Sequence, residues 1–393
     1  MPSSPWKALV AIPRRSAWFL WRYLPHLIVL VSLAIAARSV LTTWLAVTLS
    51  NLSPWFGVFI KPLAPFGFMG FIVVALWIVG SGSPLLRREL SQRSRFNLVQ
   101  VIALPALTCY LMLGLFRADT QSFAATAINE EAVNSTFVEG YGNRTSIGIT
   151  VFSVALIAAC LLLRKMFRYF EFDQRGIRWL VPVAYIEALW MATVGLWLVE
   201  LYSDVDTWLQ KRSFMVEFSR LLEGSAVDRM WSIIAGVLDF LANLGGEVIV
   251  PFAWLTLGFV LFRIDSLVLA EASTPQTVER VALWTQKDSY DSPASVGSLH
   301  AMWSEMKNLA RIGLLPFMSF ILLVMAMKVL DLGIFTIYRE VFVPGDIWED
   351  SLGEGILSFV TNLTHYVLII PLVVAAVEYA ARYHVGELVG SDR

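Results

Sequence analysis

The apolar stretch Trp231–Phe262 (WSIIAGVLDFLANLGGEVIVPFAWLTLGFVLF) constrains the fold of this chain most. As one straight helix it would extend ~48 Å at 1.5 Å per residue, whereas a bilayer hydrocarbon core is ~30 Å thick. The pair Gly245-Gly246 and the following Pro251 are weak points in any helix. The stretch must therefore tilt steeply, bend or break into two helical pieces, and a broken backbone would have to face protein or water. A glycine hinge between an interfacial piece and an ordinary span is the simpler alternative.

Three polar side chains lie around this expected break: Asp239, Asn243 and Glu247. Broken membrane helices often build ion and substrate sites, because a half-helix end presents a dipole and unpaired backbone groups. The sequence therefore predicts a candidate binding site or ion relay here, and one net crossing of the membrane by the whole stretch.

The composition indicates an integral membrane protein whose principal partner is the lipid bilayer. The chain is 57% hydrophobic and only 16% charged, whereas ordinary soluble domains carry about 25% charged residues. A net charge of -1 gives no overall field that would favour nucleic acid as a partner. The two cysteines, Cys109 and Cys160, both fall in apolar runs, so we interpret them as packing residues.

The pattern of apolar runs predicts an all-α polytopic membrane protein with about eight transmembrane helices and two interfacial amphipathic helices. We expect the whole chain, 1–393, to form a single transmembrane domain. One interfacial helix is expected at 204–229 and the other at the end of the polar segment 263–311. The predicted spans are about 27–47, 63–81, 98–116, 147–163, 179–199, 231–262, 312–336 and 356–380.

Basic residues predict the threading of these spans. Lys and Arg concentrate in the segments that we assign to the cytoplasm, as the positive-inside rule requires. The basic, aromatic segment 1–24 is then a cytoplasmic amphipathic N-terminus, and 263–311 is also cytoplasmic. The helix at 204–229 and a polar loop at 117–146 lie outside, and both termini are cytoplasmic.

Charged residues inside the predicted spans are the strongest candidates for function. Each costs at least ~2.5 kcal/mol at the bilayer centre, so most should face the bundle interior and find a partner. We expect Lys328 and Asp331, three residues apart, to neutralise each other, and Glu378 near its span end to reach the headgroups. The others should pair across helices, either as an ion relay or as salt bridges that fix helix order. They are Arg38, Glu187, Asp239 and Glu247.

His365 is the one histidine deep in a predicted span, with Thr361 and Asn362 within one turn. It suits a proton carrier or an acyl-transfer base, although a histidine that hydrogen-bonds between helices is the commoner case. The candidate set for binding or an ion relay is therefore Arg38, Glu187, Asp239, Asn243, Glu247, Lys328, Asp331 and His365.

Three functions are compatible with these features. The first is a transporter or channel for an ion or small solute, with its pathway near the break in 231–262. The second is a structural or accessory subunit of a larger membrane complex, which would dock through 204–229 and 263–311. The third is a membrane-embedded enzyme acting on a lipid-linked substrate, weakened because the first outer loop, 48–62, contains no acid. Signature motifs of soluble enzymes are missing, so we assign no catalytic residue, metal ligand or cofactor.

Overall fold

The structure is a computed structural model, and every regular element that it describes is helical. Four helical segments are long and apolar enough to cross a membrane: Leu9–Ser50, Trp55–Gly80, Phe317–Glu340 and Gly355–Arg382. These findings agree with an all-α membrane protein. The count of eight spans stays a prediction, because much of the fifth and sixth falls outside the described residues. Those described are 6–87, 106–107, 109–133, 150–170, 182, 185–186, 188–190, 192–194, 197, 250–262, 314–341 and 347–390.

The N-terminal segment and the first predicted span form one continuous helical rod. Helix α1 (Trp6–Ser39) passes through the π-helical turn η1 (Val40–Leu45) into α2 (Ala46–Ser50). Pro13 and Pro25 lie inside α1, where each removes one backbone hydrogen bond. The rod therefore begins in the segment expected to lie on the membrane surface and continues without a loop into the apolar run.

The predicted outer turn after this rod contains a short helix, α3 (Pro54–Ile60), which leads into α4 (Leu63–Gly80). Ser53 is extended, with φ of -164° and ψ of 139°, and Pro54 follows it at the first helical position. Proline is well suited to start a helix, since its φ is already helical and its missing N–H has no partner there. Helix α4 agrees closely with the second predicted span.

The chain divides into two compact units. Unit 1 comprises 1–40, 64–115 and 250–393, and unit 2 comprises 41–63 and 116–249. The boundary along the N-terminal rod falls in the π-helical turn η1. The single transmembrane domain expected from the sequence stays a prediction, and the two units are described separately below.

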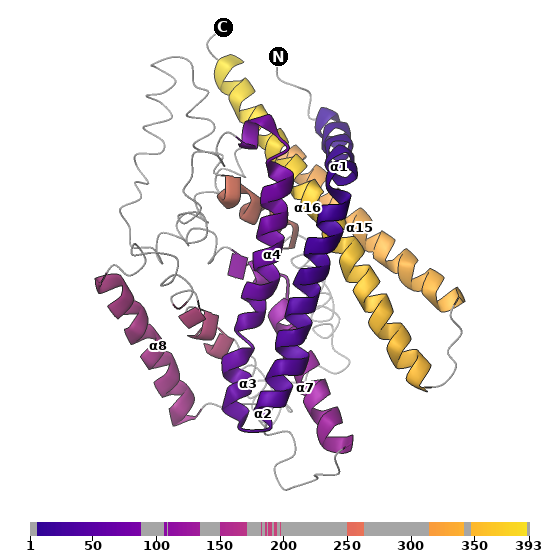
Figure 1. The fold of residues 1–393 in the computed structure, drawn as a ribbon. Helices are drawn as coiled ribbons and strands as arrows, with labels where there is room; N and C mark the ends of the chain where they lie inside the picture. Colours follow the sequence, from indigo (N-terminus) through magenta and orange to yellow (C-terminus); the bar gives the residue numbers. More distant parts are fainter. Residues whose placement is uncertain are drawn as a thin grey trace, which may run out of the picture. The chain divides into compact units, whose positions relative to one another are not determined.

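In unit 1, α1 lies beside α16 (Ile347–Gly390), and the two helices run antiparallel (Figure 1). Helix α15 (Leu314–Val341) packs against both. At 44 residues, α16 would extend ~66 Å, so only part of it fits within a bilayer. Its most buried part runs from Tyr366 to Ala381, where it forms the centre of the unit.

The helix Val250–Phe262 approaches α16 closely at a glycine. A Cβ atom added to Gly258 would lie 2.8 Å from side-chain methyl carbons of both Val373 and Val377. Small residues allow this close approach between membrane helices, which lack a hydrophobic drive to associate in lipid. This glycine therefore fixes the distance between the described end of the 231–262 stretch and α16.

In unit 2, α7 (Leu115–Val133) occupies much of the region that we predicted as a polar loop at 117–146. Phe123 and Ala127, one turn apart, pack in a buried cluster with Ala46 and Val47. The loop prediction was wrong for this part because an apolar face of so few residues gives little periodic signal. The alanine-rich, glycine-free composition of the segment nevertheless suits a helix.

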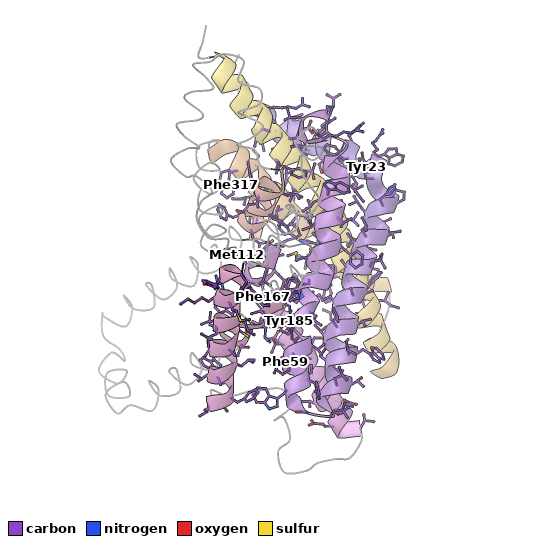
Figure 2. All side chains as sticks on the ribbon, turned by 60° about the vertical axis from the view of Figure 1, so that its left-hand side comes forward. Tyr23, Phe59, Met112, Phe167, Tyr185 and Phe317 are labelled. Carbon is purple, nitrogen blue, oxygen red and sulfur yellow. The ribbon has the colours of Figure 1, made fainter. Side chains whose placement is uncertain are left out.

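Helix α8 (Val151–Tyr169) covers most of the fourth predicted span, also in unit 2. Cys160 on this helix packs with Val58 and Leu189 in a second buried cluster. Beside that cluster, the Tyr185 hydroxyl donates a hydrogen bond of 2.7 Å to the backbone carbonyl of Phe59 (Figure 2). Both cysteines are free and buried, in agreement with a packing role.

Candidate functional site

The clearest polar contact within the predicted spans joins two of the candidate residues. Nδ1 of His365 on α16 lies 3.1 Å from Oδ2 of Asp331 on α15. Both side chains are largely covered, with 19% of His365 and 25% of Asp331 exposed. Asp331 thus has a partner on another helix rather than the intrahelical lysine expected from spacing. Lys328, one turn earlier on α15, has an exposed side chain and makes interactions of its own.

Only one oxygen of the Asp331 carboxylate is satisfied within the described part of the chain. Oδ1 is buried and has no hydrogen-bond partner there. An ionised carboxylate accepts hydrogen bonds at about four positions, and leaving a buried acceptor unpaired is costly. This oxygen therefore keeps an unused capacity to accept a hydrogen bond.

A buried aromatic ring packs against His365, and further rings pack against that ring. The rings of His365 and Tyr366 are 5.5 Å apart, centroid to centroid. Tyr366 in turn packs edge-on against Phe68 of α4 at 5.0 Å and lies 6.2 Å from Trp254. Phe68 also packs edge-on against Tyr110 at 5.9 Å. We call Phe68, Tyr110, Trp254 and Tyr366 the aromatic cluster; all four are buried.

Arg38 contacts two rings of the aromatic cluster. Its Cζ atom is 5.8 Å from the ring centroids of both Phe68 and Tyr110, within the range of a cation–π interaction. Its Nη2 also donates a hydrogen bond of 3.2 Å to the carbonyl of Leu115. These contacts connect Arg38 to other segments of the chain, and the expected pairing of Arg38 with another charge stays a prediction. The π-helical turn η1 begins two residues later, a feature frequent at functional sites.

The structure thus brings three of the eight candidate residues to one cluster in unit 1: Arg38, Asp331 and His365. Trp254 connects the cluster to the 231–262 stretch, and its indole Nε1 is buried without a partner among the described residues. The expected break itself is not described. Four candidates lie outside the described residues: Glu187, Asp239, Asn243 and Glu247.

Sequence reasoning missed the environment of Glu378. This residue is only 2% exposed, so it does not reach the headgroups as expected. Its Oε2 accepts a hydrogen bond of 2.9 Å from Nε of Arg15, and its Oε1 accepts bonds from Nη2 of Arg15 and Nη2 of Arg382. The spacing of four residues between Glu378 and Arg382 could have predicted their ion pair, because side chains four apart are neighbours on a helix. The contact with Arg15 could not be predicted from local spacing, because the two residues are 363 positions apart.

A second missed pair lies in unit 2. Lys61 and Asp119 are 4% and 3% exposed, and the carboxylate attracts the ammonium group electrostatically. The Lys61 Nζ atom also lies 4.7 Å from the ring centroid of Phe123. We predicted Lys61 in an outer turn and Asp119 in an outer loop. Charged residues are ordinarily exposed in such segments, so we did not expect either side chain to be buried. The unexpected helices α3 and α7 provide this burial.

Comparisons of the chain with models of known families, with curated proteins and with solved structures give no match. Among the described residues, no group of three or more His, Cys, Asp or Glu side chains is arranged to hold a metal ion. The chemistry of the site is what indicates function: an acid and an imidazole on two apolar helices, with a buried ring beside the imidazole.

Proposed function

We propose that this protein is an integral membrane transporter or channel for an ion or small solute, in which Asp331 and His365 relay the ion. The observation that carries the proposal is the contact between these side chains inside two apolar helices, with one carboxylate oxygen unpartnered. Ionisable residues inside membrane spans are rare, and they commonly mark ion pathways and proton relays.

The proton is the ion that this pair suits best. Imidazole is the side chain whose ordinary pKa allows it to gain and lose a proton near neutral pH. A carboxylate at hydrogen-bond distance accepts that proton or stabilises the protonated ring. In this proposal the pair provides two adjacent positions for one proton, and the proton leaves the pair through the unpartnered oxygen of Asp331.

We further propose that the pathway runs near the 231–262 stretch. Trp254 at the described end of that stretch lies against Tyr366, the neighbour of His365. In this proposal Asp239, Asn243, Glu247 and Glu187 line the rest of the route. The proposal includes about eight spans with both termini cytoplasmic, since this threading leaves most basic residues on the cytoplasmic side.

The test is voltage-driven proton flux in proteoliposomes. The purified full-length chain is reconstituted with an internal pH-sensitive dye, and a potassium gradient with valinomycin sets the membrane potential. We expect flux above that of protein-free vesicles. We expect Asp331→Asn and His365→Asn each to reduce it about tenfold or more, the effect of a barrier raised by roughly 1.4 kcal/mol.

Matched controls remove the same chemistry at exposed positions. Glu340→Gln neutralises an exposed acid at the end of α15, and His26→Asn removes an exposed imidazole from α1. Both should leave the flux unchanged. Flux equal to that of protein-free vesicles, or full flux in folded Asp331→Asn and His365→Asn proteins, contradicts the proposal.

No contact among the described residues specifically favours an accessory subunit or an enzyme acting on a lipid-linked substrate. The two docking segments of the first, 204–229 and 263–311, lie outside them. Co-purification with fixed partners and an absence of flux would favour the subunit. Lipid turnover that depends on His365 would favour the enzyme.

A further inference from the structure

A groove of about 680 Å³ lies between the N-terminal part of α1 and the C-terminal part of α16, both in unit 1. Its position is at the end of an apolar span, because Arg382 on its wall is the last residue of the candidate span Gly355–Arg382. This volume falls within the range of pockets that hold small ligands, about 300–1,000 Å³. The groove does not include the Asp331–His365 pair.

The wall of this groove is basic. Three arginines and one glutamate line it, so positive charge exceeds negative charge by two. Glu378 already binds Arg15 and Arg382, and these contacts hold the two guanidinium groups in the wall. Arg14 is exposed and has neither an ion pair nor a hydrogen bond within the described residues. The groove therefore presents one uncommitted guanidinium and two preorganised ones.

The remaining lining is apolar and aromatic. Val10, Ala11 and Ala375 contribute small apolar surfaces, and Trp18 and Tyr379 contribute rings. Trp18 is 42% exposed, and the Arg15 guanidinium stacks on it with Cζ 4.5 Å from the ring centroid. Tryptophan and tyrosine gather where a membrane span meets the headgroups. The ligand that this surface fits has an anionic head and an apolar body.

We propose that the groove binds an anionic phospholipid, with Arg14 and Arg382 as donors to the headgroup phosphate. Basic pockets between membrane helices recognise such headgroups, and a guanidinium binds a phosphate through two parallel hydrogen bonds. The acyl chains would follow the apolar surfaces of α1 and α16 away from the arginines. Free phosphate lacks this apolar part, so it would leave the small side chains and rings of the wall without a partner. The inference depends on membrane insertion and not on transport.

The experiment is native mass spectrometry of the full-length protein in a mild detergent. It is titrated with phosphatidylglycerol and, separately, with phosphatidylcholine carrying the same acyl chains. We expect phosphatidylglycerol to bind more tightly, and the double variant Arg14→Gln/Arg382→Gln to weaken its binding about tenfold or more, given the loss of two favourable charges. Arg14→Gln alone, at a position without described contacts, should give a smaller loss in a protein that folds normally.

The matched control is Arg87→Gln/Arg339→Gln, which also removes two exposed positive charges but outside the groove. It should bind phosphatidylglycerol like the wild type. Equal binding of the two lipids, equal losses in both double variants, or full displacement of the lipid by millimolar inorganic phosphate would overturn the proposal. Because no flux is measured, failure here is distinct from failure of the transport proposal.

Discussion

Two ionic groups in unit 1 attach α16 to other helices, and they differ in how fully their acids are paired. Glu378 accepts hydrogen bonds from two guanidinium groups through both oxygens and is almost completely buried. Asp331 contacts one imidazole through one oxygen, and its other oxygen has no partner among the described residues. The first carboxylate therefore has both oxygens paired with guanidinium groups, whereas the second has one oxygen without a described partner.

From this difference we propose that the two ionic groups have different roles, one structural and one in ion transfer. A saturated ion pair contributes to helix order, and breaking it leaves an uncompensated buried charge. A pair with one unpaired oxygen carries the cost of a buried unsatisfied acceptor, and in the proposed function this pair transfers the ion. The following predictions test the contrast, from the largest expected effect to the smallest.

Arg15→Gln should give the largest loss of stability. It removes two of the three hydrogen bonds to Glu378, and we expect the free energy of unfolding to fall by about 3 kcal/mol. Unfolding by SDS titration in mixed micelles measures this change. Arg14→Gln, one residue away and without a described contact, is the control. Equal stability of the two variants would refute the structural role of the Arg15–Glu378 pair.

Gly258→Leu should have an intermediate effect. The added side chain would collide with Val373 and Val377 on the buried part of α16, and overpacking of this kind typically costs about 1–3 kcal/mol. The same SDS titration measures it. Gly70→Leu on α4 is the control, since a Cβ there meets nothing within 4 Å. If both leucine variants are as stable as the wild type, helix Val250–Phe262 does not approach α16 as described.

Asp331→Asn should have the smallest effect on stability, even though it should reduce proton flux about tenfold or more. The uncharged amide can still contact His365 through its oxygen, so we expect a change in unfolding free energy within about 1 kcal/mol of zero. Glu378→Gln, measured in parallel, should be clearly more destabilising. A loss as large in Asp331→Asn as in Glu378→Gln would show that both acids are structural, and the contrast would disappear.

The sequence predicted the helical spans better than the contacts between them. The length and apolarity of 63–81, 312–336 and 356–380 correspond to α4, α15 and α16, because a continuous apolar run is a local property. Helix α7 was missed because its buried face consists of only a few apolar residues.

The sequence predicted which residues were candidates for the site, but it did not predict which of them contact one another. Arg38, Asp331 and His365 stand out because charge and imidazole are rare in spans. Their partners did not follow from spacing, since Asp331 and His365 are 34 residues apart and on different helices. We predicted that Glu378 reaches the lipid headgroups because no residue near it in the sequence indicates its ion pair with Arg15.

The most direct test of the account compares voltage-driven proton flux, per folded protein, in vesicles that contain wild-type, Asp331→Asn or Arg15→Gln protein. We predict that Asp331→Asn loses flux while remaining as stable as the wild type, and that the Arg15→Gln protein that stays folded retains flux. Equal flux in all three proteins, or equal loss in both variants, would contradict the assignment of ion transfer to Asp331 and His365.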